Sequence, residues 1–315
     1  METEFKKLLN RKKHIEDTGK HFSKRLEVLR DMVNYGSWLI PRAYDSSKKG
    51  YEELITIGVL LKQIVMMIDA IDVLASNAIT VPGFLQSRAA FEASLYIEWI
   101  LKEDSEKRAK HYYVSNLRKN RLWALRLIEG TEQQIQFSDD TKKLAPHVNF
   151  FEQGIKDEAE RQVKDINRIL SQDSLKRIND ELENLYRRRK IEPNWYAPIA
   201  EKNSLKWIAS NVYRIPEYLF FYNLGSEVVH SSSYYHHIEI SKGNNIKFKP
   251  IRNLSTMTNL LQNSMGTAIH TYRIIIERYR PGEMVNYIRK YNSDWRKYYL
   301  NIPSSIEYHS IEEGK

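Results

Sequence analysis

Apolar residues recur at helical spacing along most of the chain. In the first forty residues they are Phe5, Leu8, Leu9, Leu26, Leu29 and Val33, which predicts helix from about residue 3 to residue 39. We expect Gly19 to break this helix and Pro41, followed by Asp45, Ser46 and Ser47, to end it. The same spacing predicts helices at about 51–76, 83–102 and 105–130.

Residues 157–190 differ from the rest of the chain in composition. They are rich in charge and carry sparse apolar positions three and four residues apart, which predicts a protruding charged helical hairpin. The segment ends in four consecutive basic residues, Arg187 to Lys190. Cations complement the C-terminal end of a helix dipole, so we interpret this run as a helix end; a nucleic-acid patch is the alternative.

The last third of the chain returns to helix after one strand-like interruption. Helices are predicted at 204–213 and 216–231, a β-hairpin at 237–251, and helices at 255–280 and 283–300. The final helix carries an aromatic stripe, spaced three or four residues apart: Met284, Tyr287, Tyr291, Trp295 and Tyr298. Because this spacing gathers the rings on one face, it favours packing over base stacking.

These patterns predict an all-α fold, a multi-helix bundle with the charged hairpin and one small β-hairpin. We divide the chain into an N-terminal helical region (1–47), a helical core domain (48–280, with 157–190 as an insertion) and a C-terminal helix and tail (281–315). Only 12 glycines and 9 prolines occur in 315 residues, which agrees with long helices.

Composition and charge exclude several functions. The chain has no cysteine, which removes disulfides, thiol catalysis and cysteine-ligated metals. Its net charge of +9 permits an anionic partner such as RNA or a nucleotide. The charged N-terminus does not resemble a signal peptide. The apolar run from Leu54 to Ala75 is interrupted by Lys62, Gln63, Asp69 and Asp72, so we expect a buried helix, no membrane contact and a cytoplasmic protein.

Familiar catalytic motifs are absent. The sequence has no phosphate-binding glycine loop, no Gly-x-Ser-x-Gly, no His-Glu-x-x-His and no EF-hand loop. What it offers instead is polar residues inside apolar helices.

One such set lies near residue 230. Asn223, Ser226, Glu227 and His230 stand at i, i+3, i+4 and i+7, so a helix places them on one face. Gly225 would let another helix approach closely. Glu227 and His230 also have the Glu-x-x-His spacing of di-iron bundles, but no second such motif is present, and His236 and His237 are adjacent. We therefore expect no metal and no other cofactor.

A second set lies on the helix at 83–102. Arg88 and Glu92 are four residues apart in apolar surroundings, which predicts a partly buried ion pair. We hypothesise that Arg88 contacts the polar face near His230. The alternative is that both sets only satisfy each other's hydrogen bonds between packed helices.

Several short motifs carry a family resemblance. They are Asn194-Trp195-Tyr196, Ser204-Leu205-Lys206-Trp207 and Tyr222-Asn223-x-x-Ser226-x-x-x-His230-Ser231, preceded by Arg88-x-x-x-Glu92. Together, over about residues 54–280, they resemble a bacterial family of all-helical proteins that is distantly similar to the HEPN proteins. HEPN proteins are often metal-independent ribonucleases of toxin–antitoxin or antiphage systems, and they commonly act as two-fold dimers.

The resemblance implies roles for individual residues. His230 matches the HEPN histidine and would be the general acid or base, while the expected arginine of the same helix is replaced, with Asn223 seven residues before His230. Arg88 from another helix would then stabilise the charge on phosphorus. Asn223 and Ser226 would orient the phosphate, and Glu92, Glu227, Ser231 and Tyr222 would support the site. A homodimer and an antitoxin or defence-system partner protein are implied.

If RNA binds, we expect it along 105–130, where seven basic and two acidic residues give a net charge of +5. The candidates there are Arg118, Lys119, Arg121 and Arg126. Two other functions stay open. One is a non-catalytic nucleotide-, RNA- or protein-binding sensor module of a defence system, and the other is a structural helical scaffold.

Overall fold

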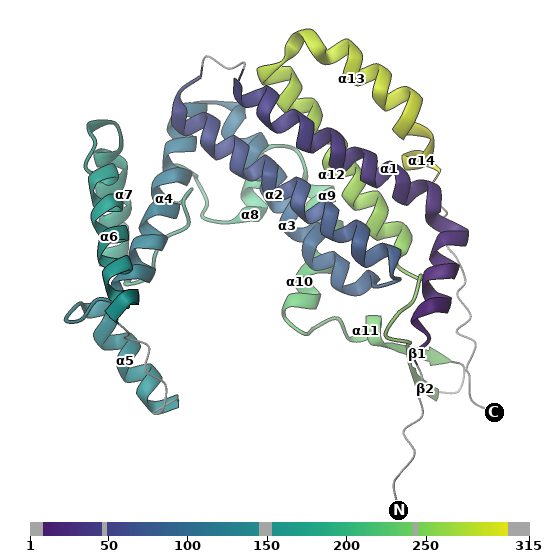
Figure 1. Ribbon diagram of the computed structural model, residues 1–315, viewed down its shortest axis with the longest axis horizontal. Coiled ribbons are helices and arrows are strands. Elements are labelled where there is room, and N and C mark those ends of the chain that lie inside the picture. Colours follow the sequence, from purple (N-terminus) through teal and green to yellow (C-terminus); the bar gives the residue numbers. More distant parts are fainter. Residues whose placement is uncertain (1–8, 46–48, 145–152, 242–244, 302–315) are drawn as a thin grey trace, which may run out of the picture. The chain divides into compact units, whose positions relative to one another are not determined.

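The computed structural model describes residues 9–45, 49–144, 153–241 and 245–301 (Figure 1). Four predicted features fall partly outside these ranges: the start of the first helix, the turn at Ser46 and Ser47, the tip of the β-hairpin, and the C-terminal tail.

The described chain is all-α apart from one hairpin, as predicted. The long helices are α1 (Arg11–Asp45), α2 (Tyr51–Ser76), α3 (Thr80–Lys102), α4 (Ser105–Leu125), α5 (Glu132–Leu144), α6 (Gln153–Leu170), α7 (Asp173–Arg189) and α12 (Met257–Tyr279). Shorter elements follow α7 and α12: α8 (Leu205–Asn211), α9 (Ile215–Glu217), the π-helix η1 (Tyr218–Tyr222), α10 (Asn223–Val229), α11 (Tyr234–His237), the 3₁₀ turn η2 (Pro281–Glu283), α13 (Met284–Lys290), the π-helix η3 (Tyr291–Trp295) and α14 (Arg296–Leu300).

The chain divides into two compact units. The first comprises Met1–Lys49, Ile57–Lys102 and Leu205–Lys315, and the second comprises Gly50–Thr56 and Glu103–Ser204. The charged segment 157–190 lies within the second unit, and the described residues of 1–47 and 281–315 lie within the first. The pattern of residues 157–190 identified the charged half of the second unit but not the helices on which it packs.

The first unit is built around α12. This helix packs against α1 and α3, and most of its apolar residues are buried (Figure 1). Tyr272 of α12 donates a hydrogen bond to the carbonyl of Met32 at 2.9 Å, and Trp295 of η3 donates to Asp31 at 2.7 Å. The rings of Tyr35, Tyr272, Tyr287 and Trp295 contact one another. Tyr287 and Trp295 of the predicted aromatic stripe are therefore core residues, as their spacing indicated.

Helix α1 corrects two expectations. It continues through Gly19, because a single glycine costs a helix only ~1 kcal/mol, and long flanking segments outweigh that cost. Pro41 lies inside α1 and not at its end. Nine residues spread along α1 from Thr18 to Ala43 are buried, so tertiary packing holds the helix together.

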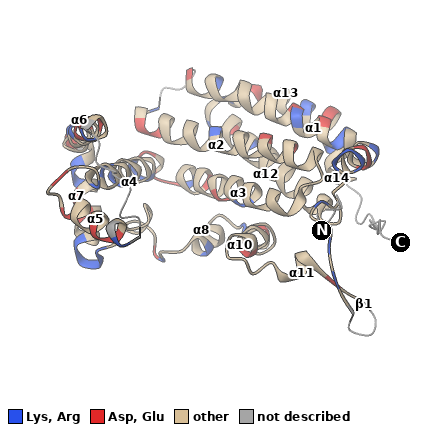
Figure 2. Cartoon of the chain, turned by 60° about the horizontal axis from the view of Figure 1, so that its bottom comes forward, with Lys and Arg blue, Asp and Glu red and all other residues tan. Residues whose placement is uncertain are grey.

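The second unit has its own core. Val114 of α4 packs with Ile166 and Leu170 of α6 and with Leu175, Ile178 and Leu182 of α7. The apolar positions of the predicted hairpin are therefore buried against α4. Its charged residues lie on the other faces of α6 and α7, and α7 ends in the basic run Arg187–Arg189 (Figure 2).

The hairpin of β1 (Ile238–Ser241) and β2 (Asn245–Phe248) is the only sheet of the described residues. Ile238 pairs with Phe248 and Ile240 with Ile246 in an antiparallel register, at the predicted place in the sequence.

Helix α2 is, among the described residues, the only helix long and apolar enough to cross a membrane by length and composition. Leu60, Ile64, Ile68 and Ile71 are buried in the first unit, whereas Val59, Met66 and Val73 are exposed. A core helix meets the same criterion of length and composition, so the hydropathy of α2 is weak evidence for a membrane.

Candidate functional site

Helix α10 lies directly against α3 at Gly225. A Cβ added to Gly225 would lie 2.5 Å from the carbonyl oxygen of Phe84 and 2.5 Å from the Cβ of Arg88. The predicted close approach is therefore present, and it fixes which side of α10 faces α3. The exposed polar residues of α10 lie on its other sides.

The predicted polar face is mainly exposed. Asn223, Glu227 and His230 are exposed and Ser226 is half-buried. No hydrogen bond or ion pair of the His230 side chain occurs within the described part of the chain. This arrangement contradicts the alternative in which the face only satisfies hydrogen bonds between helices, because an exposed group needs no such partner.

Helix α10 ends in a strained turn next to His230. His230 is the C-cap, and Ser231 adopts a left-handed conformation with φ of 54°. The amide of Ser232 bonds the carbonyl of Glu227 at 2.8 Å, and that of Ser231 bonds Val228 at 3.3 Å, which is the Schellman pattern. Glycine usually occupies this position, since a side chain there costs ~1 kcal/mol.

Arg88 contacts the opposite end of α10. Its Nη2 donates to the hydroxyl of Tyr222 at 2.6 Å, and its guanidinium lies 4.3 Å from the centre of the Tyr222 ring. Tyr222 stacks on Tyr218 with a centroid distance of 4.8 Å, an i, i+4 contact within the π-helix η1. Burial raises the pKa of Tyr218, and the nearby charge of Arg88 opposes that rise, so Tyr218 keeps its proton at pH 7.

The predicted ion pair between Arg88 and Glu92 is not among the described interactions. Glu92 accepts a hydrogen bond from Tyr96 at 2.8 Å instead. Arg88 turns toward Tyr222, and its Nη1 is buried without a hydrogen-bond partner in the described residues. Arg88 therefore has an unsatisfied donor beside the N-terminal end of α10.

Arg88 and His230 do not meet within one chain. Arg88 is bonded to Tyr222. His230 lies eight positions further along the helix, about 12 Å from Tyr222 along its axis. The predicted site residues Arg88 and His230 therefore lie at the two ends of α10 and do not form one catalytic centre within the chain. Arg88 contacts the predicted supporting residue Tyr222, whereas His230 stands apart.

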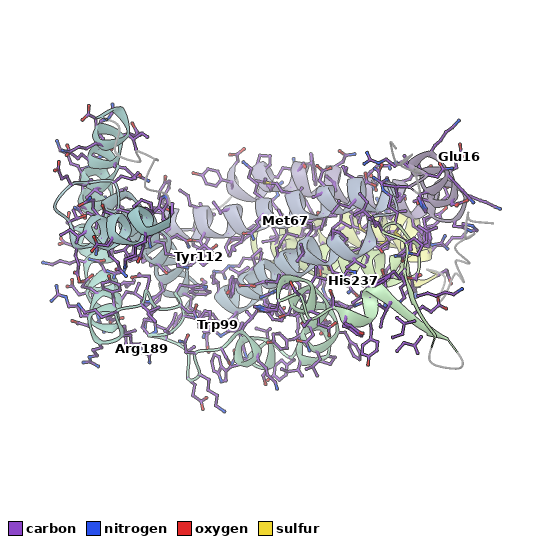
Figure 3. All side chains as sticks on the ribbon, turned by 90° about the horizontal axis from the view of Figure 1, so that it is seen from below. Glu16, Met67, Trp99, Tyr112, Arg189 and His237 are labelled. Carbon is purple, nitrogen blue, oxygen red and sulfur yellow. The ribbon has the colours of Figure 1, made fainter. Side chains whose placement is uncertain are left out.

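Other histidines lie just beyond α10. The Nε2 of His236 is 3.7 Å from a carboxylate oxygen of Glu227, and its ring lies 6.2 Å from the ring of Phe84. Burial lowers the pKa of His236, and the charge of Glu227 opposes this. His237, labelled in Figure 3 beside the hairpin, bonds Ser233 at 3.1 Å. No three His, Asp or Glu side chains converge on a metal-sized site in the described ranges.

The basic residues of α4 are not one surface. Arg118 is fully buried and bonds Glu192, Glu183 and Asn179, so it is not a surface contact for RNA. Arg121 lies 3.6 Å from Glu183, which neutralises part of its charge. Lys119 is exposed and Arg126 stacks on Trp123 at 4.6 Å. A contact with nucleic acid at Lys119 and Arg126 stays a prediction.

A second polar cluster in the first unit was missed from the sequence. Arg214, which is buried, donates to Ser94 at 2.9 Å and Glu217 at 3.1 Å and lies 3.5 Å from Glu98. His270 of α12 bonds Glu98 at 2.9 Å. A charged residue inside the apolar run of α3 was the available signal, but nothing local connects Glu98 to a histidine 172 residues later.

Comparison with known proteins places these residues in a family. A family model described as "Family of unknown function (DUF5677)" matches residues 54–246, more than half of the chain. The match includes Arg88, Tyr222, His230 and His236, and ends before His270. No curated protein and no solved structure matches.

Proposed function

The chain belongs to the DUF5677 family, and from this premise we propose that it is an HEPN-like, metal-independent ribonuclease of the cytoplasm that acts as a toxin or antiphage-defence effector. The observation that carries the proposal is His230: an exposed imidazole at the end of α10, free of partners in the described residues and on one face with Asn223 and Ser226. A general acid or base needs this combination of access and freedom.

The proposed chemistry uses only protein groups. His230 takes the proton of a ribose 2′-hydroxyl, the 2′-oxygen attacks the adjacent phosphorus, and the bond from phosphorus to the 5′-oxygen breaks. The products are a 2′,3′-cyclic phosphate and a 5′-hydroxyl, whose proton comes from water. Asn223 and Ser226 donate to the phosphate, and Arg88 neutralises the charge that develops on it.

A two-fold dimer would complete such a centre. Because Arg88 and His230 lie at opposite ends of α10, two antiparallel α10 helices place Arg88 of one copy beside His230 of the other, twice. Three apolar side chains of this segment support such an interface by their exposure: Leu219, Phe220 and Val229, with Phe220 69% exposed. The homodimer is thus part of the proposal.

Mixing two inactive variants tests both the activity and the composite site. Arg88→Ala and His230→Ala, each assayed alone on single-stranded RNA, should be inactive. After co-expression, about half of the dimers are mixed and each has one intact site, so about one quarter of the wild-type rate should return. Sites built within one chain would give no recovery.

Controls come from outside α10. His21 of α1 and Arg289 of α13 are exposed, so His21→Ala and Arg289→Ala should keep full activity. If the wild-type protein neither cleaves RNA nor arrests growth when expressed with its neighbouring genes, the proposal is wrong.

A second candidate function is a binding module without turnover. It is favoured by one observation: Arg88 is already bonded to Tyr222 and does not reach His230. Such a module would sense RNA, a nucleotide or an antitoxin-like partner protein. Crosslinking of RNA to the α10 face with no cleavage by wild-type protein would favour it, and RNA cleavage that His230→Ala abolishes would exclude it.

A further inference from the structure

Helix α2 presents a narrow apolar stripe to solvent. Val59, Met66 and Val73 are spaced seven residues apart and are 53%, 54% and 58% exposed. Over seven residues a helix drifts by only about 20°, so the three side chains lie almost in one line, which is about 21 Å long. A Cβ added to Gly58, at the edge of the stripe, would meet nothing within 4 Å. Single exposed apolar residues are ordinary, but three in heptad register are typical of a helix that packs against another helix.

Two opposite charges lie along one edge of this stripe. Lys62 and Asp69 are exposed, and helix geometry places them about 40° and 60° from Met66 on the same side. Neither side chain forms an ion pair within the described residues, and the two are about 10 Å apart along the axis, too far to pair with each other. Asp72, in contrast, is paired with Arg30 of α1 at 2.8 Å. Lys62 and Asp69 are therefore available to a partner, whereas Asp72 is not.

The stripe is complementary to itself in the antiparallel orientation. A two-fold axis at Met66 that reverses the helix direction places Met66 against Met66 of the second copy, and Val59 against Val73. Lys62 of one copy then lies beside Asp69 of the other, on the same edge and within about 1.5 Å in height along the axis, and this contact occurs twice. In a parallel pair Lys62 would face Lys62 and Asp69 would face Asp69, and both contacts are repulsive.

We propose that this stripe is an interface with a second copy of the chain, in which two α2 helices pack antiparallel and form two ion pairs between Lys62 and Asp69. A lipid surface fits less well, because it would bury both charges of each helix within about 6 Å of Met66. The contact area of one helix pair is small, so we expect a Kd on the order of 10 µM. The interface uses other residues than the one proposed at α10 and does not depend on RNA cleavage.

Cysteine cross-linking tests the arrangement, because the natural chain has no cysteine and introduced thiols report without background. Under mild oxidation of the full chain, Met66→Cys should form a disulfide-linked dimer, since the two-fold axis brings position 66 next to itself. Val59→Cys alone and Val73→Cys alone should stay monomeric on a non-reducing gel, because each position lies about 21 Å from its counterpart. An equal mixture of these two variants should cross-link. Self-linking of Val59→Cys would exclude the antiparallel orientation.

Charge reversal tests the ion pairs by analytical ultracentrifugation. All chains also carry Phe220→Asp, which removes an apolar side chain from the interface proposed at α10, so the measured association reports on α2. Lys62→Asp and Asp69→Lys should each weaken association by about tenfold or more, because each brings like charges together twice. The double variant Lys62→Asp/Asp69→Lys should restore the affinity, and so should an equal mixture of the two single variants. Lys20→Asp, at an exposed lysine of α1, is the control and should change nothing.

All reversed charges are exposed, so urea unfolding should show the same stability for each variant and exclude misfolding as the cause. Three results would overturn the proposal: a monomer at every concentration up to about 500 µM, no cross-linking of Met66→Cys, or no recovery in the double variant. Binding of the Phe220→Asp chain to phosphatidylcholine vesicles that Met66→Asp abolishes would assign the stripe to a lipid surface and overturn it as well. A failed ribonuclease assay would change none of these measurements.

Discussion

The buried arginine of α4 provides the sharpest test of the structure. Arg118 donates to both carboxylate oxygens of Glu192, at 2.7 and 3.1 Å, and from Nη1 to Glu183 and Asn179, each at 3.0 Å. It thus ties α4 to α7 and to the segment that follows α7. Arg118→Met keeps most of the side-chain volume and removes all four hydrogen bonds.

The expected loss of stability depends on which carboxylates lose their partner when Arg118 is replaced. Glu183 keeps Arg187 at 3.0 Å and Arg121 at 3.6 Å, so it stays paired. Glu192, whose side chain is 12% exposed, loses the only ion-pair partner described for it. Removing one partner of a buried pair costs about 3–5 kcal/mol, and with one orphaned carboxylate we expect the low end, about 3 kcal/mol. For a unit of this size, that lowers the melting temperature by about 12–24 °C.

Lys119→Met is the matched control, since Lys119 is the next residue and is exposed. Urea unfolding gives the loss of stability, and hydrogen exchange by mass spectrometry should locate it in α4, α6 and α7. Adding Glu192→Gln to Arg118→Met should restore roughly half of the loss, because the orphaned charge is then gone. Equal stability of Arg118→Met and Lys119→Met would refute the reasoning and would return Arg118 to the candidate RNA contacts.

The same hydrogen bonds predict how the stability difference between wild type and Arg118→Met depends on pH. Burial alone raises the pKa of Glu183, but the hydrogen bonds from Arg118 and Arg187 outweigh it, and the pKa is lowered from 4.5. A carboxyl group whose pKa is lowered in the folded state stabilises the fold above pH 4.5. This stabilisation is lost as the pH falls through the pKa of the folded state. The gap between wild type and Arg118→Met should therefore narrow as the pH falls below about 4.5.

Four further predictions concern the region of α10. Ser231→Gly should stabilise the protein by about 1 kcal/mol in urea unfolding, because it relieves the left-handed conformation; a loss of stability would contradict the described turn. Gly225→Ala should destabilise by about 1–3 kcal/mol, because the new methyl meets the Phe84 carbonyl oxygen, and should weaken the Arg88 contact with Tyr222; an unchanged melting curve would show that α10 is not seated on α3. His230→Ala should change stability by less than about 0.5 kcal/mol, which makes its effect on activity interpretable. The pKa of His236 is lowered from 6.5 by burial, with Glu227 opposing and Lys249 and His237 adding to the shift, so the unfolded state binds its proton first and stability falls as the pH drops below about 6.5. His236→Asn should lose less stability than wild type between pH 7.5 and 5.5, and equal losses would exclude this cause.

The position of each helix was largely readable from the sequence, because helical periodicity is a local property. Residues 157–190 show how far this extends. Their apolar positions at spacings of three and four predicted two helices, which are α6 and α7. These apolar residues pack against Val114 on α4, which is distant in the chain. No local sequence pattern predicts that contact. The sequence therefore predicted the two helices but not the helix against which they pack.

The candidate site was also predicted only in part from the sequence. The spacing of Asn223, Ser226, Glu227 and His230 placed them on one face of a helix, because helix geometry fixes which residues share a face. Arg88 was expected near His230, but packing at Gly225 sets α10 so that Arg88 meets Tyr222 instead.

Arg118 and Lys62 show the remaining difference. In the sequence both are basic residues on helices that carry apolar positions. Burial makes the first a structural anchor bonded to three side chains, while the second is exposed on α2 and forms no ion pair within the described residues. The sequence by itself determined which residues form helices and which faces are polar. Only the tertiary structure decided which of those charges are neutralised inside the protein and which can meet a partner, because this depends on neighbours that lie far away along the chain.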